Sequence, residues 1–228
     1  MKTVIITGAN GNLGTAVTTH FLEKGYQVIA AVSEEAKETF LIHQHLEVQV
    51  ADLSDEIQAD NFVTTIIGRY GQVHAALLLV GGFAAGNIDS TSGEDISKQL
   101  TLNFNTAYFV ARPVLRHMKQ HKEGKIIFIG ARPALVASYG KDLVAYSLSK
   151  SLLFKLAEFI NEEAKETGIT ATVIAPGTLD TPSNRKSMPE VNPADWVKPE
   201  DLAGILEFIV SEKGDTLRET VLKVYDNS

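Results

Sequence analysis

Short apolar runs alternate with longer amphipathic segments along the chain. The runs are rich in Val, Ile and Leu and lie at 3–7, 27–32, 46–50, 75–80, 125–129, 170–175 and 221–224. Because apolar residues on both faces indicate a strand that is covered on both sides, these runs predict a buried parallel sheet. The segments between them predict helices at 13–24, 34–41, 57–69, 94–120, 145–167 and 199–212.

This alternation predicts the fold class. Strands that alternate with helices make right-handed crossovers, so we expect an α/β fold with a Rossmann-type, doubly wound, parallel seven-stranded sheet. A length of 228 residues suits a single domain, 1–228. The proline-rich stretch 176–198 is too long for a plain connection, so we expect a substrate lid near 182–198.

Composition and charge exclude several kinds of partner. The net charge of −7 argues against nucleic-acid binding, which needs a basic surface. The chain has no cysteine, and His117 and His121 have no third ligand nearby in sequence, so we expect no metal site. We find neither a signal peptide nor an apolar run that could span a bilayer, and therefore expect a soluble, cytoplasmic protein without a membrane partner.

The turn after the first strand is rich in glycine. It places Gly8, Gly11 and Gly14 between a strand and a helix, the context in which glycines let the backbone approach a pyrophosphate. The sequence therefore predicts a dinucleotide phosphate site, for which the candidate residues are Gly8, Asn10, Gly11, Asn12, Leu13 and Gly14.

Residues at the ends of the next two strands are candidates for contact with the adenosine half of the dinucleotide. Val32 and Ser33 do not distinguish NAD from NADP, but Glu34 and Glu35 would repel the extra phosphate and tilt the expectation towards NAD. After the third strand, Asp52 and Leu53 are candidates for contact with the adenine. An aspartate that caps the following helix explains Asp52 equally well.

Tyr146 and Lys150 lie four residues apart in a predicted helix, so their side chains rise from one face. An ammonium beside a phenol favours the phenolate, and we therefore expect Lys150 to lower the pKa of Tyr146. The pair predicts a proton donor and acceptor that works near neutral pH.

Taken in order, these motifs resemble the short-chain dehydrogenase/reductase family across essentially the whole chain. The resemblance implies that Tyr146 is the general acid/base, that Lys150 binds the nicotinamide ribose and that Asn103 holds a proton-relay water. It also implies a dinucleotide site completed by Gly81, Gly82, Pro176, Gly177, Leu179 and Thr181. Relatives pair through two helices, here 94–120 and 145–167, so a homodimer or homotetramer is expected.

The chain departs from the family pattern at two places. After the fourth strand it has Val80-Gly81-Gly82-Phe83 where the family usually has Asn-Asn/Ala-Ala-Gly, and the catalytic serine is missing. Ala131 stands where the family places a catalytic serine, and Ser138 can replace that serine only if its loop folds back. Ser147 and Ser149 are poor replacements, because they face away from Tyr146 on a helix. Loops 81–87 and 179–190, and the change at 131, resemble the dihydropteridine reductases within the family. In that group, however, tryptophan replaces Phe83 and an acidic residue replaces Val32.

We therefore expect an NAD(P)H-dependent oxidoreductase that transfers hydride to an electron-poor C=N or conjugated small molecule, for example a quinonoid dihydropteridine. The alternatives are a carbonyl or enoyl reductase that uses Ser138 and a non-catalytic NAD(P)-binding sensor. Arg132 can bind an acidic group of the substrate or pair with a surface carboxylate. Trp196 can close over substrate or anchor the lid to the core, and the second role is expected.

Overall fold

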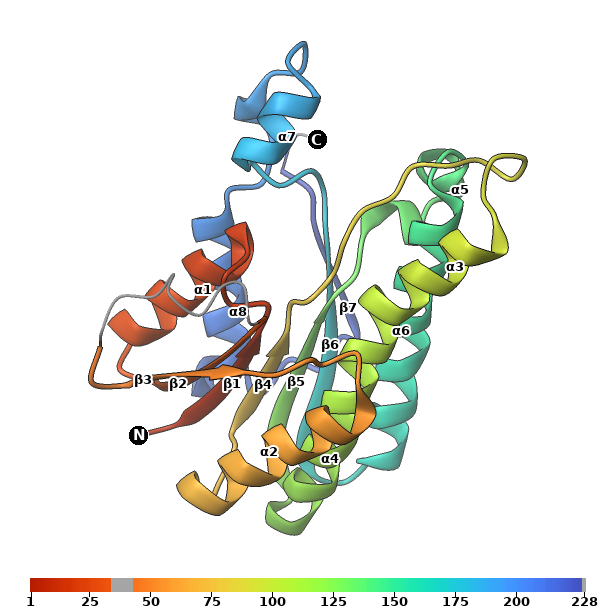
Figure 1. Cartoon of the computed structure of the whole chain (residues 1–228). Coiled ribbons are helices and arrows are strands. Elements are labelled where there is room, and N and C mark those ends of the chain that lie inside the picture. The colour runs from red at the N-terminus through yellow and green to blue at the C-terminus, as the bar shows by residue number, and fades with distance from the viewer. Residues whose placement is uncertain (34–42, 227–228) are drawn as a thin grey trace.

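The computed structural model describes residues 1–33 and 43–226. Its described part contains one sheet of seven parallel strands in the order β3-β2-β1-β4-β5-β6-β7 (Figure 1). The strands are β1 Thr3–Thr7, β2 Gln27–Val32, β3 Leu46–Val50, β4 Ala75–Leu78, β5 Glu123–Ile129, β6 Gly168–Pro176 and β7 Val221–Val224. The predicted fold class is confirmed. The winding direction reverses between β1 and β4, which opens a crevice at the carboxyl ends of these two strands.

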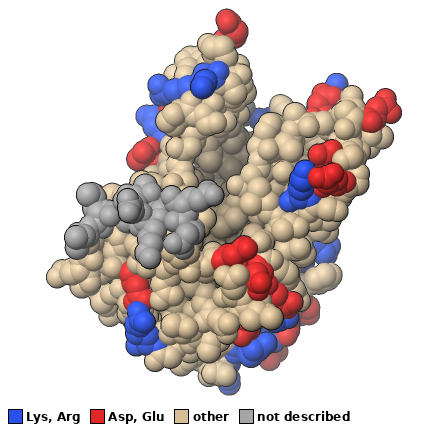
Figure 2. Space-filling model, viewed as in Figure 1, with Lys and Arg blue, Asp and Glu red and all other residues tan. Residues whose placement is uncertain are grey.

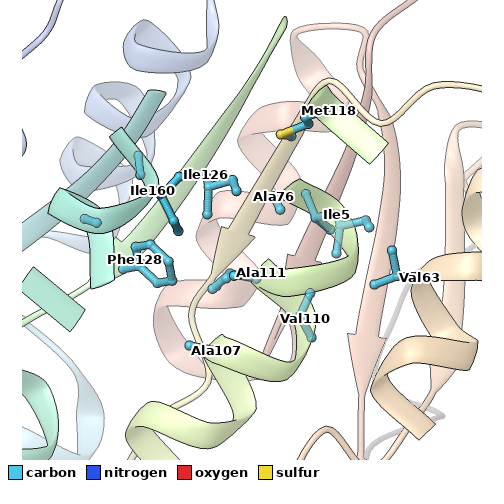
Figure 3. Packing of buried hydrophobic residues seen from close by; sticks show 14 of the residues in the cluster. Ile5, Val63, Ala76, Ala107, Val110, Ala111, Met118, Ile126, Phe128 and Ile160 are labelled. Atoms are coloured by element: carbon cyan, nitrogen blue, oxygen red, sulfur yellow. The ribbon is translucent and has the colours of Figure 1, made fainter. Parts of the chain in front are cut away.

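Helices cover both faces of the sheet. On one face lie α1 (Asn12–Glu23) and α8 (Pro199–Val210), and on the other lie α2 (Glu56–Tyr70), α4 (Thr106–His121) and α6 (Val144–Glu163) (Figure 1). Each face has its own apolar cluster, one of which includes Ile5, Ala76, Val110, Ile126 and Phe128 (Figure 3). Every residue of β1, β2 and β4 is buried, which explains the apolar residues at successive positions.

The helix predicted over 94–120 is divided into three parts. It begins as α3 (Gly93–Leu100), widens into a π-helical turn at Thr101–Asn105, and continues as α4. Ser92 and Asp95 form a reciprocal capping box at the start of α3, since each side chain bonds the backbone N–H of the other. The helix predicted at 34–41 lies outside the described residues.

Shorter elements interrupt two of the connections. The stretch 176–198 contains α7 (Pro182–Ser187) and a 3₁₀ turn at Pro193–Asp195, so it is more regular than the expected loop. The β5–α6 connection contains a 3₁₀ turn at Arg132–Ala134 and the short helix α5 (Ala137–Gly140), and a further 3₁₀ turn spans Glu212–Gly214. Within 1–33 and 43–226, helices long and apolar enough to cross a bilayer are absent.

Candidate active site

The predicted site residues gather at the carboxyl edge of the sheet. The β1–α1 turn, the loop after β4, the end of β5 and the segment after β6 all leave the sheet at this edge (Figure 1). Figure 2 shows a hollow between the α7 segment and the side that carries α3 and α5, and its visible walls are mostly uncharged. This is where ligands bind in doubly wound folds.

The β1–α1 turn requires glycine at two positions. Gly8 has φ +62°, and a Cβ atom there would lie 3.1 Å from the backbone nitrogen of Val80. A Cβ atom at Gly14 would lie 2.1 Å from the carbonyl oxygen of Gly8. The turn is closed by Gly11, whose N–H donates to the Gly8 carbonyl at 3.0 Å. The glycines thus bring the start of α1 close against the strand.

The positive end of α1 is open. Among the described residues, no side chain caps its first turn and no acidic residue lies in that turn. By contrast, Asp55 accepts hydrogen bonds from the first turn of α2, and Ser92 caps α3. The backbone N–H groups of Asn12, Leu13 and Gly14 therefore face outward at a helix N-terminus that suits an anion. These residues fit the pyrophosphate of a dinucleotide.

Asp52 forms a turn of its own after β3. Its Oδ1 accepts from the backbone N–H of Ser54 at 2.9 Å and from the Ser54 hydroxyl at 2.6 Å, which lowers the pKa of Asp52. The cap of α2 is Asp55, so helix capping does not explain Asp52. Leu53 turns its side chain into the core. Contact of either residue with adenine stays a prediction.

The residues behind the expectation of NAD, Glu34 and Glu35, lie outside the described part of the chain. Val32 is buried at the end of β2 and the next residue, Ser33, is exposed. The choice between NAD and NADP therefore stays a prediction.

The side chains of Lys150 and Asn103 both end close to Gly81. The ammonium of Lys150 is buried and donates to the carbonyl oxygen of Ile129 at 2.8 Å. A Cβ atom at residue 81 would lie 2.8 Å from Lys150 Nζ and 2.8 Å from Asn103 Oδ1. Gly81 is thus needed for these two side chains to reach their places.

The side chain of Asn103 clamps the main chain of Gly82. Its Oδ1 accepts from the Gly82 N–H at 2.9 Å, and its Nδ2 lies 3.0 Å from the Gly82 carbonyl oxygen. The same Nδ2 lies 2.8 Å from Gln99 Oε1 and 3.0 Å from Ser149 Oγ. Both ends of the amide are engaged within the protein, so the structure shows Asn103 positioning the loop after β4. Its link to a relay water stays a prediction.

Tyr146 lies in the first turn of α6, one turn before Lys150. Its ring lies 5.3 Å from the ring of Phe83, centre to centre, and Phe83 is 67% exposed. Burial raises the pKa of Tyr146 to about 12 and lowers the pKa of Lys150 to about 8. The expected lowering of the Tyr146 pKa is therefore corrected: the pKa is raised, because burial disfavours the charged phenolate.

Ala131 is buried beyond the end of β5, with 4% of its surface exposed. Ser138 lies on the exposed side of α5. Ser149 belongs to the site, which sequence reasoning missed: it is fully buried, and its hydroxyl donates to the carbonyl oxygen of Tyr146 at 2.8 Å while it accepts from Asn103. Gln99, four residues before Asn103 on the same helical face, was missed as well. The i, i+4 spacing was the available signal.

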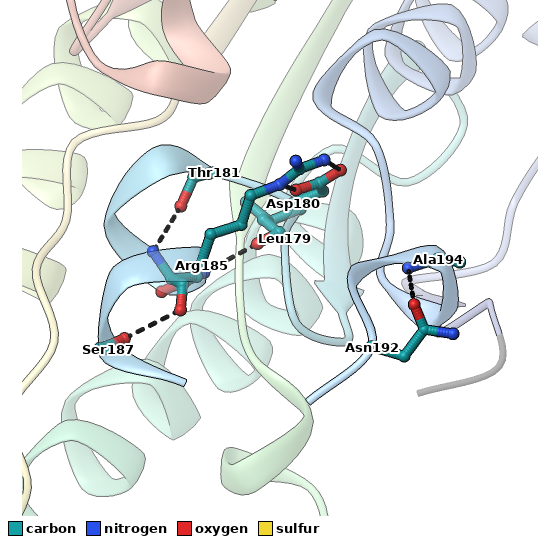
Figure 4. A network of polar contacts seen from close by, with 8 residues as sticks. Leu179, Asp180, Thr181, Arg185, Ser187, Asn192 and Ala194 are labelled. Carbon is teal, nitrogen blue, oxygen red and sulfur yellow. Dashed lines mark hydrogen bonds and ion pairs between the residues drawn. The ribbon is translucent and has the colours of Figure 1, made fainter. Parts of the chain in front are cut away.

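The segment after β6 is built around Thr181 (Figure 4). The buried Thr181 hydroxyl accepts from the Asn184 N–H at 3.2 Å and so caps α7, which leaves its hydrogen for a ligand. Arg185 makes a two-pronged ion pair with Asp180, at 2.6 Å from Nε and 2.8 Å from Nη2. The Asn184 side chain donates to the Leu179 carbonyl at 2.8 Å. Contacts of this segment with nicotinamide stay predictions.

The stretch 182–198 is fixed at both ends. Leu179 pairs with Val197 as an isolated bridge, and the Asp180 N–H donates to the Val197 carbonyl at 2.8 Å. Trp196 is 2% exposed, which supports the anchoring role expected for it. Directly after β6, before this stretch begins, the Gly177 N–H donates to the Val224 carbonyl oxygen at 2.8 Å. Pro176, the last residue of β6, is buried beside it.

Comparisons with known proteins agree with this geometry. The short chain dehydrogenase family matches residues 2–192. The chain is 28% identical over 203 residues to 2-(R)-hydroxypropyl-CoM dehydrogenase of Xanthobacter autotrophicus, covering 83% of this chain and 80% of that protein. It is 26% identical over 234 residues to the 3-oxoacyl-[acyl-carrier-protein] reductase MabA of Mycobacterium bovis, covering 98% and 91%. The solved structure of ElxO with NADP bound superposes with a TM-score of 0.90 at 22% identity, covering 99% and 97%.

Proposed function

Because the chain belongs to the short-chain dehydrogenase family, we propose that it is an NAD(P)H-dependent reductase that acts on an electron-poor C=N or conjugated substrate. The observation that carries the proposal is Ala131, a buried methyl group where the resemblance expects a serine hydroxyl. With one hydroxyl removed, the site favours a substrate that accepts hydride without a second hydrogen bond to its reacting group.

Tyr146 gives its proton to the substrate in the proposed reaction. Burial keeps this phenol protonated at neutral pH, which suits reduction and disfavours alcohol oxidation, since oxidation needs a base. The bound dinucleotide supplies the hydride. Lys150 is held by the Ile129 carbonyl at a place where it can bind the dinucleotide's ribose, and the Asn103–Gly82 clamp fixes the loop beside it.

A quinonoid dihydropteridine has the required chemistry, because its conjugated C=N system is already electron-poor. Support for this substrate comes from the resemblance of loops 81–87 and 179–190 to the dihydropteridine reductases. Phe83, exposed against the Tyr146 ring, offers such a planar molecule an aromatic face. The names of the relatives found support the oxidoreductase activity, and do not favour a pteridine.

Reduction of a 3-oxoacyl ketone is the second candidate. It is favoured by the relationship to MabA, whose name describes a 3-oxoacyl reductase. A ketone oxygen benefits from two donors, so this reaction calls on Ser138 to act beside Tyr146. Ser138 is exposed on α5, in the connection that leads to the helix of Tyr146.

A substrate panel with both NADH and NADPH tests the proposal. The panel contains quinonoid dihydropterin, an enone and a 3-oxoacyl thioester, and the variants Ala131→Ser and Ser138→Ala are compared with the unaltered protein. We expect fastest turnover on the quinonoid or conjugated compounds, a gain on the ketone in Ala131→Ser and no effect of Ser138→Ala.

If the unaltered protein reduced the 3-oxoacyl ketone fastest, and Ser138→Ala lost that activity, the second candidate would replace the proposal. Binding of NADH or NADPH without turnover on any compound would support a sensor. We propose NAD(P) as the cofactor, with NAD preferred over NADP. Much faster turnover with NADPH than with NADH would reverse that preference.

Two structural roles belong to the same proposal. We propose that 182–198 acts as the substrate lid, because its two ends are anchored while α7 stands away from the sheet (Figure 1).

We also propose a homodimer or homotetramer, since α4 and α6 expose an apolar surface. Its members come from the π turn, α4 and α6: Leu102, Tyr108, Leu148, Leu152 and Phe159.

A further inference from the structure

Three side chains form a stack at the carboxyl edge of the sheet. The guanidinium carbon of Arg132 lies 4.1 Å from the ring centre of Tyr139 and 4.7 Å from that of Tyr225. Nη2 of Arg132 also donates to the Tyr139 hydroxyl at 2.7 Å. We call these three residues the Arg132 stack. Cation–π contacts of this kind are attractive at exposed sites and become stronger where water is excluded.

The stack crosses the end of β6. Arg132 follows β5 and Tyr225 follows β7, while β6 lies between these two strands. Neighbouring strands are about 4.8 Å apart, so the stack spans roughly 10 Å over the point where Pro176 and Gly177 leave the sheet. It therefore lies between α5 and the beginning of the segment that leads to α7.

The short helix α5 depends on contacts of this kind. A helix of four residues does not hold its shape by its own hydrogen bonds. One side of α5 is fixed, because a Cβ atom at Gly140 would lie 2.6 Å from the Pro133 carbonyl oxygen and 2.9 Å from Ser147 Oγ. The other side carries Tyr139, which is 50% exposed and meets the stack.

We propose that Arg132 and Tyr225 are positioning residues that hold Tyr139 as a wall of the substrate cleft, and so decide which substrates reach Tyr146. Tyr225, which directly follows β7, thereby becomes part of the substrate site. For its kinetic consequence the inference rests on the proposed reductase activity. The stack also gives Arg132 a role besides the two readings that the sequence offered.

Amide hydrogen exchange on the whole protein tests whether the stack holds α5. The variants are Tyr225→Leu, which removes the ring, and Tyr225→Phe, which keeps it. In Tyr225→Leu we expect amides in 134–141 to exchange about tenfold faster, and in Tyr225→Phe at the rate of the unaltered protein. Amides of β1 and β4 should be unaffected in both. If Tyr225→Leu left 134–141 unchanged, or loosened the sheet equally, the proposal would be wrong.

Steady-state kinetics test whether the wall selects substrates. With the panel compound that the unaltered protein reduces fastest, Tyr225→Leu should raise KM about fivefold and leave kcat within about twofold, because the stack does not touch the reacting atoms. Tyr225→Phe should restore the normal KM. An unchanged KM in Tyr225→Leu, or a loss confined to kcat, would overturn the selecting role. Failure of the unaltered protein on every compound would defeat the proposed function, and the exchange rates would still decide the positioning role.

Discussion

The Lys150 ammonium hydrogen-bonds the carbonyl oxygen of Ile129, 2.8 Å away, at the last residue of β5. This contact ties α6, which carries Tyr146, to the carboxyl edge of the sheet. The charge is kept at a cost, because burial lowers the pKa of Lys150 from its ordinary 10.5 to about 8. A buried charge such as Lys150 lowers the stability of the fold. Such a residue is expected at a site where function has been selected over stability.

Lys150→Met should therefore stabilise the protein while it abolishes turnover. A pKa displacement of this size corresponds to about 3 kcal/mol, and loss of the hydrogen bond to Ile129 takes back about 1 kcal/mol. The gain should be largest at pH 7 and should fade towards pH 10.5, where the lysine of the unfolded chain also loses its proton. Urea unfolding at several pH values measures it, without added dinucleotide. A loss of stability at pH 7 would contradict this reading.

Gly81→Ala should disable the site without unfolding the protein. The new Cβ would lie 2.8 Å from both Lys150 Nζ and Asn103 Oδ1, so at least one side chain must leave its place. We expect a fall in kcat/KM of about a hundredfold. The matched control is Gly68→Ala on the exposed face of α2, where a Cβ meets nothing within 4 Å. That change should stabilise the protein by about 0.5–1 kcal/mol, as alanine does in a helix, and leave turnover unchanged.

Tyr146→Phe should remove most turnover and leave dinucleotide binding within a few-fold. A positioned proton donor contributes about 10²–10⁴ to the rate, and the phenylalanine ring keeps the packing against Phe83. Single-turnover rates together with fluorescence titration of NADH or NADPH measure the two effects separately. Full activity in the variant would show that the proton comes from elsewhere.

Stability should fall as the pH drops below about 6.5, in a range where carboxylates remain ionised. Burial lowers the pKa of His74 and His117 below 6.5. Both are neutral acceptors in the folded protein: His74 Nδ1 accepts from the Thr3 N–H at 3.0 Å, and His117 Nε2 from the Val73 N–H at 3.2 Å. The unfolded chain binds more protons in this range, so acid favours unfolding.

The variant His117→Gln checks this assignment, because its amide oxygen can replace Nε2 as the acceptor. It should lessen the fall between pH 7 and 5.5 by up to about 1 kcal/mol. A fall as steep as that of the unaltered protein in urea unfolding would show that His117 does not carry the effect.

Phe159→Glu should reduce the proposed oligomer to a monomer. Phe159 is 65% exposed on α6, and a carboxylate at an apolar contact is left unpaired on association. Light scattering after gel filtration gives the mass. Phe208→Glu is the control, because Phe208 is an exposed phenylalanine of α8 on the opposite face. A monomeric unaltered protein, or equal effects of both changes, would rule out this surface.

The sheet could be predicted because its evidence is local. Runs such as 3–7 and 27–32 are short, rich in β-branched residues and apolar at successive positions, which is typical of strands covered on both faces. The π turn could not be predicted, because Thr101–Asn105 has the same apolar spacing as an ordinary helix. Helix α7 was not predicted, because Pro182 lies in a proline-rich stretch that is typical of a loop. Proline is also common at the first position of a helix, which is its place in α7.

Sequence reasoning brought the candidate residues together at the carboxyl edge of the sheet, where the structure places them, but their roles stay predictions and their electrostatics could not be predicted. Spacing placed Tyr146 and Lys150 on one face, but the sign of the Tyr146 pKa change depends on burial, which spacing does not reveal. The Asn103 clamp on Gly82 joins positions 21 apart along the chain, and the Arg132 stack joins the β5–α6 connection to the residue that follows β7. Such contacts can be predicted only after the strand order is known, because the strand order decides which connections are neighbours.

The π-helical turn at Thr101–Asn105 has one consequence for the way this chain can vary. Each π turn holds an extra residue, so the helical spacing read along the sequence shifts by one residue between α3 and α4. The two helices still turn the same sides to their neighbours, and Asn103 lies within the turn that absorbs the extra residue. Deleting one residue there would give a regular α-helix with every other amino acid retained. In that helix α3 and α4 would keep nearly the same relative orientation, but Asn103 would lose the widened turn in which it now lies. At this point the site is encoded by the count of residues as much as by their identity.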